Sequence, residues 1–385
     1  MEKVILKDSP YYNREDIFVK VNEIFEETGF YKNVSKEDRI FLKVNLLTAA
    51  SPDKAVCTNP VFVDAVIKVL LKNGYKRLEC GDSPGIGSPE KVAKASGIYD
   101  ILKQNNVSFV SIENEKRFKT PKAHRRKYIN LFNGIDEIDT LVNLPKLKTH
   151  CLMTMTLGVK NLYGLLPGKA NKVDGHMKEN TTEKFAFYLK DIFETVSSKV
   201  KVFTLIDGIT GMEGDGPGNG LPVNTGIVAG SFDSESLDYF LLRWCGLSLN
   251  EYPLFLIAEN KEEIKNSTDK LIEKYGTFKR VIKRPKKGDV TFNIPLFLRK
   301  IYERFFYSYT KIDDKKCKRC GICKKSCPVD AIKIRKKIFS IVKKRCIRCF
   351  CCHELCPHDA VLIKQTLPLA ILKKFVNIFQ RITGI

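Results

Sequence analysis

The stretch CIRCFCCHELCP, residues 346–357, contains five cysteines within twelve residues. The same spacing occurs once more, 29 positions upstream, in the stretch CKRCGICKKSCP at residues 317–328. Cys351 is the fifth cysteine, because the residue that matches it upstream is Ile322. The chain therefore carries the pattern C-x2-C-x2-C-x3-C-P twice, with Cys351 outside it.

This pattern is typical of 4Fe–4S binding, because two residues between thiolates let one tight loop present successive sulfurs to different irons. The cysteine before the proline serves the other cluster. The rule assigns one cluster to Cys317, Cys320, Cys323 and Cys356, and a second to Cys346, Cys349, Cys352 and Cys327. Zinc also favours C-x2-C pairs, but two four-cysteine runs that each end in Cys-Pro indicate iron–sulfur clusters. Cys351 is interpreted as a buried small hydrophobe or as a substitute for a neighbouring ligand.

The segment 313–365 resembles the two-cluster ferredoxins of the bacterial type on these cysteines. The resemblance implies a small α+β module, two 4Fe–4S clusters and one-electron transfer. It identifies neither the electron donor nor the acceptor.

The length of 385 residues predicts two or three domains with ordinary packed cores. The five cysteines outside the two cluster sets are scattered, which fits a reducing cytoplasm better than a disulfide framework. The start of the chain, MEKVILKDSPYY, carries charges where a signal peptide needs an apolar run. No segment offers about 20 uncharged residues for a membrane span. We therefore expect a cytoplasmic protein.

The net charge of +22 is concentrated around the cysteine runs, because residues 277–348 hold 24 Lys and Arg against 5 Asp and Glu. Lys and Arg near clusters offset the negative charge of the thiolate-bound cubanes. The excess predicts an acidic redox partner protein first and anionic lipid second. Nucleic acid is an unlikely partner, since no recognition motif accompanies the charge.

Two apolar stripes at helical spacing flank the cysteine runs. The first predicts a basic amphipathic helical linker over 277–312, and the second predicts an amphipathic helix over 366–385. Packing against the larger domain is the favoured use of both, while the terminal helix also suits peripheral membrane contact.

Residues 1–276 alternate short apolar runs with amphipathic helices, such as RIFLKVNLL at 39–47 followed by PVFVDAVIKVLLKNG at 60–74. This order predicts an α/β domain, with a largely parallel sheet and flanking helices. In such sheets ligands collect beyond the carboxyl ends of the strands. Three stretches there have unusual composition.

The first stretch, GDSPGIGSP at 81–89, places Asp82, Ser83 and Gly85 before a helix start, where N–H groups can hold an anion. An ordinary tight turn is an equal interpretation, because the dinucleotide fingerprint is incomplete.

The second stretch, residues 143–176, is rich in lysine, glycine and apolar residues and indicates chain folded into a cleft. A phosphate or carboxylate ligand would suit its cations. The candidates for binding this anionic small molecule are Lys146, Lys148, Lys160 and Asn161, with His150 as a catalytic candidate. The alternative is scattered surface charge.

The third stretch, DGITGMEGDGPGNGLP at 207–222, contains acids among six glycines and is expected to be a loop. Asp207 and Glu213 are the catalytic candidates here, as proton donors or as ligands of a divalent cation. A mobile surface lid is the alternative.

The motifs KVNLL, GDSPG, NLPKLKTH, TLGVKNLYGLLPGK and DGITGMEGDGP occur in the order typical of a prokaryotic family, domain of unknown function 362. The chain resembles that family over residues 1–270, and members are often fused to a ferredoxin module. The resemblance implies a common architecture and a shared ligand pocket without naming a reaction.

These patterns together predict an iron–sulfur oxidoreductase, or its electron-delivery component, whose clusters exchange electrons with an anionic ligand or partner at the α/β domain. The alternatives are a non-enzymatic assembly factor or adaptor and a redox sensor, each docking on an acidic partner.

Overall fold

The computed structural model of the chain describes residues 3–168, 175, 179, 181–285, 305, 307–335, 338–369 and 371. It divides into two compact units, Met1–Pro285 and Lys286–Ile385, and each is described by itself. The first unit extends past the predicted boundary at residue 276. Its last segment is attached to α9 (Ser234–Trp244) by two backbone hydrogen bonds, from Phe278 N–H to Trp244 O and from Ile282 N–H to Cys245 O.

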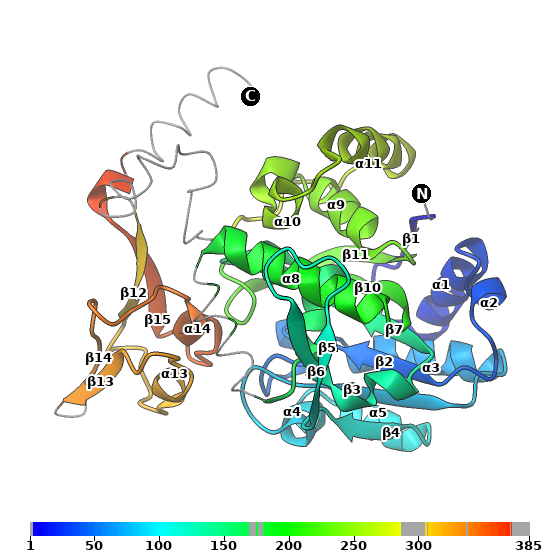
Figure 1. Ribbon diagram of the computed structural model, residues 1–385, viewed down its shortest axis with the longest axis horizontal. Helices are drawn as coiled ribbons and strands as arrows, with labels where there is room; N and C mark the ends of the chain where they lie inside the picture. Colours follow the sequence, from blue (N-terminus) through cyan, green and yellow to red (C-terminus); the bar gives the residue numbers. More distant parts are fainter. Residues whose placement is uncertain are drawn as a thin grey trace. The chain divides into compact units, whose positions relative to one another are not determined.

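A nine-stranded sheet forms the centre of the first unit (Figure 1). Its order is β1-β11-β10-β7-β2-β3-β4, and β8 pairs with both β10 and β9. The pairs among β10, β7, β2, β3 and β4 are parallel, as is β8 with β10, whereas β1, β11 and β9 pair antiparallel. The strands are β1 (Ile5–Asp8), β2 (Ile40–Val44), β3 (Leu78–Asp82), β4 (Ser108–Ser111), β7 (Thr140–Leu144), β8 (Lys146–His150), β9 (Thr154–Thr156), β10 (Lys201–Glu213) and β11 (Leu221–Ser231). The prediction of an α/β domain with a largely parallel sheet is confirmed.

Helices cover both faces of this sheet, which is why β2 and β7 are buried along their whole length. One hydrophobic core joins the sheet to α1, α3, α4 and α5, and a second joins its other face to α8, α9 and α10. The α-helices described in this unit are α1 (Arg14–Glu27), α2 (Phe30–Asn33), α3 (Pro60–Lys72), α4 (Pro89–Ala95), α5 (Ile98–Gln104), α6 (Gly158–Asn161), α8 (Thr182–Ser197), α9, α10 (Pro253–Leu256) and α11 (Lys261–Tyr275). The 3-10 turns are η1 (Pro52–Lys54), η2 (Asn133–Glu137), η3 (Leu162–Leu165) and η4 (Leu249–Glu251).

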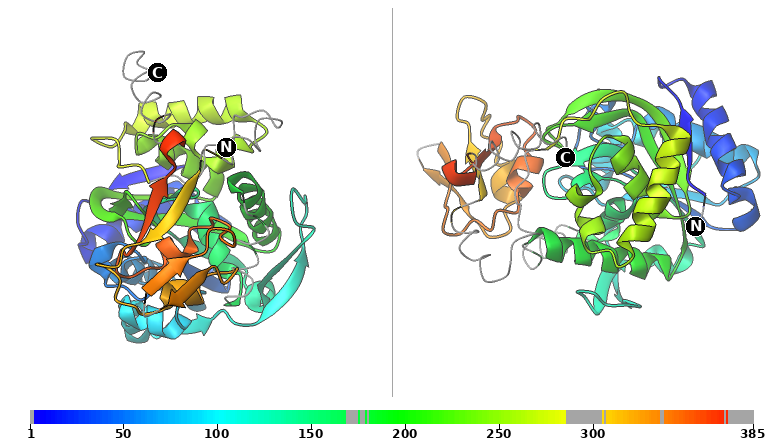
Figure 2. Two further views of the ribbon diagram at one scale, coloured as in Figure 1. Left: turned by 90° about the vertical axis from the view of Figure 1, so that its left-hand side faces the viewer. Right: turned by 90° about the horizontal axis from the view of Figure 1, so that it is seen from above.

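A separate hairpin, β5 (Glu115–Lys119) with β6 (Tyr128–Phe132), projects from the body of the first unit in both views of Figure 2. Its outer residues are largely exposed, but Phe118 and Ile129 belong to the core beneath it.

The third glycine-rich stretch differs from its prediction as a loop over 207–222. Residues up to Glu213 continue β10, and β11 begins at Leu221, so only the residues between them form the turn. Pairing with β11 stabilises this glycine-rich chain as a strand, and the register shifts between Gly208 and Thr210.

The described residues of the second unit form two antiparallel strand pairs and two short helices, which confirms the predicted α+β module. The pairs are β12 (Ser308–Ile312) with β15 (Val361–Gln365) and β13 (Ile332–Arg335) with β14 (Ile338–Ile341). The helices are α13 (Ile322–Lys325) and α14 (Cys351–Glu354).

The 29-residue repeat also appears in the backbone of this unit. Arg319 and Arg348 have φ of 58° and 57°, and Asp330 and Asp359 have φ of 46° and 49°. Left-handed φ values are uncommon for residues other than glycine, so their recurrence at one offset indicates two copies of the same chain path.

The predicted helical linker over 277–312 is wrong at its end, because residues 308–312 form β12. Ser308, Thr310 and Ile312 are buried in alternation with more exposed neighbours, which is the period of a strand paired on one side. Most of the linker and most of the predicted helix over 366–385 lie outside the described residues. Within the described residues, no helix is long and apolar enough to cross a membrane.

Candidate iron–sulfur centres and a buried lysine site

One cavity of the second unit is lined by cysteines from both runs. Cys317, Cys320 and Cys323 come from the first run, and Cys356 comes from the second. Apolar side chains close the cavity on one side, and Lys318 and Arg319 line it as well. The structure thus brings together the four residues that the sequence assigned to one cluster.

The thiols of this set are close enough to influence each other's ionisation. Burial raises the pKa of Cys323 to about 11, and the negative charges of Cys356, Cys317 and Cys320 act in the same direction. Four thiolates that repel each other need cations between them, because metal ligation requires the deprotonated form. An iron–sulfur cluster held by these four cysteines would supply those cations.

In the second set, too, a cysteine of one run lies near the cysteines of the other run. Burial raises the pKa of Cys346, and the charges of Cys349 and of Cys327 from the first run add to the effect. Cys352 is 3.7 Å from the Thr310 hydroxyl through its Sγ, and burial raises its pKa.

Backbone N–H groups point at the last cysteine of each run. Ala331 N–H donates to Cys327 Sγ at 3.1 Å, and Ala360 N–H donates to Cys356 Sγ at 3.4 Å. Hydrogen bonds to cluster sulfur tune the reduction potential. The fifth cysteine, Cys351, is buried on α14, with its Sγ 3.9 Å from the Cys349 carbonyl oxygen.

Among the described residues of the first unit, three lysines have almost completely buried side chains, and we call them the lysine row: Lys43, Lys146 and Lys148. Lys43 lies on β2. The other two alternate along β8 and share one face of the strand with His150, because strand side chains alternate with period two. Buried lysines need specific partners, since an unpaired ammonium is costly away from water.

Lys146 is paired with Asp207 of β10 at 2.8 Å. The Asp207 carboxylate also accepts hydrogen bonds from the Tyr12 hydroxyl at 2.8 Å and from Asn59 N–H at 2.9 Å. Lys146 donates to the Tyr12 oxygen at 2.5 Å. Asp207 therefore anchors the chain before α1 and the start of α3 to the sheet.

Lys43 is paired with Asp82 at 2.8 Å, where β3 ends. Asp82 also accepts from the N–H groups of Leu46 at 2.5 Å and Ser83 at 2.7 Å. The sequence does not single out Lys43, because a lysine within an apolar strand usually faces solvent. Ser83 N–H donates to Gly164 O at 3.2 Å, and Gly85 N–H donates to Leu47 O at 3.0 Å, so both N–H groups hold loops together.

Lys148 has neutral acceptors only among the described residues. Its Nζ donates to Asn45 Oδ1 at 2.7 Å and to Val56 O at 2.6 Å. Burial lowers the pKa of Lys148 to about 7. A chain of amides fixes the orientation of Asn45, because Asn45 Nδ2 donates to Asn161 Oδ1 and Asn161 Nδ2 donates to Asn143 Oδ1. Asn161, a predicted ligand-binding residue, thus orients Asn45.

The segment Gly158–Leu165 packs closely against Lys43 and Asp82 at one end and against Thr204 at the other. A Cβ at Gly164 would lie 2.1 Å from Asp82 Oδ1 and 2.6 Å from Lys43 Nζ, and one at Gly158 would lie 2.9 Å from Thr204 Cγ2. Only glycine permits this approach at either position. Asp238 of α9 holds the start of α6 by accepting from Gly158 N–H at 2.7 Å and Val159 N–H at 3.0 Å.

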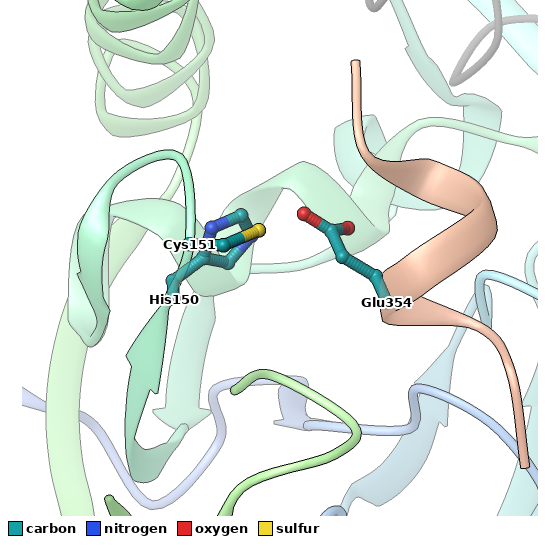
Figure 3. A group of neighbouring side chains, drawn as sticks. All are labelled: His150, Cys151 and Glu354. Atoms are coloured by element: carbon teal, nitrogen blue, oxygen red, sulfur yellow. The ribbon is translucent and has the colours of Figure 1, made fainter. Parts of the chain in front are cut away.

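The remaining predicted residues lie in different surroundings. Lys160 is partly exposed, and its Nζ is 5.3 Å from the centre of the Tyr163 ring. His150 is buried, and its Nδ1 accepts from the N–H groups of Leu152 and Met153, so a neutral ring carries its hydrogen on Nε2. Figure 3 shows the side chains of His150 and Cys151 at the end of β8. Glu354, also drawn there, belongs to α14 of the second unit.

Glu213 lies at the end of β10, away from the lysine row in the hydrogen-bond network. It accepts from Arg280 at 2.7 and 3.0 Å and from Lys283 N–H at 2.9 Å. Burial raises the pKa of Glu213, but the hydrogen bonds from Arg280 and Lys283 outweigh burial and lower it overall. These contacts attach the segment after α11 to the sheet.

Comparison with known proteins gives two family matches. Residues 40–243 match the family described as domain of unknown function (DUF362), and residues 309–357 match the 4Fe-4S dicluster domain. A relative from Synechocystis sp., named thylakoid-associated protein sll1697, is 33% identical over 243 residues, which are 63% of this chain and 74% of the relative.

Two solved structures resemble the chain weakly. A Thermotoga maritima protein is 13% identical, with a TM-score of 0.36 and coverage of 59% of this chain. The lactate racemase apoprotein from Thermoanaerobacterium thermosaccharolyticum is 13% identical, with a TM-score of 0.39 and coverage of 62% of this chain. In each case the match spans 57% of the solved chain. The family match over residues 40–243 and the similarity to the Synechocystis relative show that the chain belongs to the DUF362 family. It carries a 4Fe-4S dicluster domain after the family domain.

Proposed function

We propose that this iron–sulfur electron-transfer protein carries two 4Fe–4S clusters and exchanges electrons with an anionic ligand or an acidic partner protein. It acts in this account as an oxidoreductase or as the electron-delivery component of one. The scattered cysteines outside the runs favour a reducing compartment such as the cytoplasm.

One observation carries the cluster assignment. Cys356 lines the cavity formed by Cys317, Cys320 and Cys323, although it belongs to the other run. This exchange of the fourth ligand is typical of two-cluster modules, and a single-site zinc motif has no need of it. The influence of Cys327 on Cys346 supports the reciprocal set.

The buried cations of the first unit support an anionic ligand there. Lys43 lies near the carboxyl end of β2, and Lys146 and Lys148 lie on β8, directly after the carboxyl end of β7, where ligands of α/β domains collect. Two of them are neutralised by Asp82 and Asp207, and Lys148 is left with neutral partners. A buried lysine whose ammonium form has no counterion among the described residues favours a ligand of negative charge.

A basic and aromatic cavity beside the second cysteine set supports an acidic partner or an anionic acceptor. It has a volume of about 220 Å³ and is lined by Cys346, Tyr307, Tyr309, Lys343 and Arg348, among others. Arg348 lies 4.7 Å from the centre of the Tyr307 ring, and Lys343 lies 5.5 Å from that of Tyr309. Positive side chains next to a cluster ligand steer a negative partner toward the point where the electron leaves.

Electron transfer from the reduced protein tests this function. Anaerobically purified protein is reduced with dithionite, freed of excess reductant, and mixed with an acidic flavodoxin or with a basic cytochrome c. We expect faster oxidation of the clusters by the acidic acceptor at low salt and a steep loss of that advantage as salt rises. The paired charge reversals Lys343→Glu and Arg348→Glu should slow the reaction with flavodoxin, whereas Lys364→Glu on the exposed side of β15 should not. Equal rates with both acceptors would reject an acidic partner.

Peripheral membrane contact is a second proposal, favoured by the name of the thylakoid-associated relative and by the basic residues 277–348. Its test is sedimentation with vesicles of phosphatidylglycerol and of phosphatidylcholine. Binding confined to the anionic vesicles and reversed by salt is expected. Equal recovery in the supernatant with both vesicle types would reject it.

A further inference from the structure

We propose that Lys148 and Thr156 form a proton-coupled oxyanion site, in which Lys148 takes up one proton when a carboxylate or phosphate group binds. This inference deepens the proposed function and rests on it for the presence of an anionic ligand in the first unit. It is argued from the charges near Lys148 and from the hydrogen bonds that Lys148 and Thr156 make.

The charges of the lysine row balance except at Lys148. Lys43 with Asp82 and Lys146 with Asp207 are ion pairs at 2.8 Å, and each pair is neutral in sum. No carboxylate of the described residues lies within ion-pair distance of Lys148. A charged Lys148 would therefore be a buried cation without a counterion, a state that costs several kcal/mol.

The hydrogen bonds of Lys148 match those of a neutral amine. Its two acceptors, Asn45 Oδ1 and Val56 O, use two N–H donors. The amide chain through Asn161 keeps the oxygen of Asn45, rather than its NH2 group, directed at Lys148. A neutral amine satisfies both acceptors and retains a lone pair that can accept a proton.

A buried hydroxyl without a partner lies on the neighbouring strand. Thr156 is 4% exposed, and its Oγ1 has no hydrogen-bond partner among the described residues. Thr156 is the cross-strand partner of Lys148 in the antiparallel pair of β8 and β9. Side chains of such pairs share one face of the sheet, with Cβ atoms about 5 Å apart. The hydroxyl is thus an unused donor on the face of the sheet that carries the Lys148 side chain.

Among the ionisable groups around this site, we expect Lys148 to be the one that changes its protonation state when the anion binds. Burial raises the pKa of the Cys57 thiol, so this neighbour stays uncharged. The positive charges of Lys160 and Lys146 oppose the charging of Lys148, and Asp82 favours it. Lys160 is partly exposed and is the more hydrated of these two cations, since Lys146 is buried.

Binding of the anion is coupled to the uptake of one proton by Lys148. The anion enters, a proton from solvent adds to the Lys148 lone pair, and the resulting ammonium bonds to an anion oxygen while Thr156 Oγ1–H donates to another. The site passes from a neutral amine without an anion to an ammonium with an anion, so its net charge is unchanged. Above the pKa of Lys148, affinity for the anion should fall about tenfold per pH unit.

The test follows the Lys148 side chain by NMR. Full-length, anaerobically purified protein is labelled with ¹³C at the lysine ε-carbon and titrated with pH, alone, with acetate and with inorganic phosphate. The Lys148 signal is the one lost in Lys148→Met. We expect a midpoint near neutral pH without an anion, and an upward shift with the anion that fits the site; the acetate and phosphate arms identify its class. Thr156→Val should reduce that shift and leave the anion-free midpoint in place.

Two results would overturn the proposal. One is a Lys148 signal that titrates only near the ordinary lysine value of about 10.4. The other is a midpoint that neither acetate nor phosphate moves. Lys190→Met, which removes a partly exposed lysine paired with Glu235, is the matched control and should change neither midpoint nor shift. Iron content and the spectrum of the reduced clusters should stay normal in Lys148→Met, so failure here is distinct from failure of the electron-transfer function.

Discussion

Cys356 of the second cysteine run lines the same cavity as Cys323 of the first run. The two positions are 33 residues apart in sequence, so the fold brings the end of the second run beside the first run. Loss of one cysteine before a proline should therefore damage the cluster of the opposite run.

Replacement of Cys356 by serine tests this relationship. We expect Cys356→Ser to lose about half of the bound iron, and the lost cluster to be the one held by Cys317, Cys320 and Cys323. The spare cysteine supplies the matched control, because Cys351→Ser should retain all of the iron. Iron and sulfide analysis with electron paramagnetic resonance of the reduced proteins measures the outcome. Full cluster content in Cys356→Ser would contradict the assignment.

The Lys146–Asp207 pair is expected to stabilise the first unit through its position rather than through proton transfer. Asp207→Asn leaves Lys146 as a buried charge without its counterion and should lower the free energy of unfolding by about 3–5 kcal/mol. Tyr12→Phe removes the hydroxyl that donates to Asp207 and accepts from Lys146 but leaves the ion pair in place, so it should cost less, about 1–2 kcal/mol. The fluorescence of Trp244, the one tryptophan in the sequence, reports unfolding of this unit in urea. Equal stabilities of the two variants would reject the account.

Asp238 should make the stability of the first unit depend on pH. Burial raises its pKa to about 7, from about 3.9 in an unfolded chain, so folding favours the protonated form. The stabilisation is complete at low pH and is lost as pH rises through about 7. Between pH 5 and pH 7 the wild type should lose about 2 kcal/mol relative to Asp238→Asn, which has no charge to titrate. Urea unfolding followed by Trp244 fluorescence at both pH values measures the difference, and parallel behaviour of the two proteins would exclude this role.

The Glu213–Arg280 contact should protect the segment after α11 from proteolysis. Glu213 is buried and Arg280 is about half exposed, so solvent partly screens the pair and its contribution to stability is small. Glu213→Gln should accordingly speed trypsin cleavage at Lys279 and Lys283 about twofold to fivefold. Glu262→Gln, which breaks an exposed pair with Lys265, serves as the control and should leave cleavage unchanged. Faster cleavage in both variants, or in neither, would argue against a specific anchor.

The parts of the molecule that follow from local sequence were predictable. Cysteine spacing is a local property, and the residues that share the cavity with Cys323 followed from it. The helix over Pro60–Lys72 was predictable because Asn59 caps it and Pro60 occupies its first turn. The β-α-β order then predicted the parallel sheet.

Contacts between distant residues were not predictable in the same way. Asp207 and Glu213 were selected as reactive acids, yet each is held by a partner far along the chain, Tyr12 at 195 positions and Arg280 at 67. Lys43 was missed because only the packing of Gly164 against it shows that it is enclosed. The sequence around Thr156 contains no motif that marks it as a site residue, because its proposed role depends on the register of β8 and β9.

The most direct test of the central claim is the iron and acid-labile sulfide content of protein purified without oxygen. Two 4Fe–4S clusters predict about eight irons and about eight sulfides per chain, and a spectrum of two interacting clusters after reduction. A colourless protein that contains zinc and no sulfide would contradict the assignment of the eight cysteines and the electron-transfer function that depends on it.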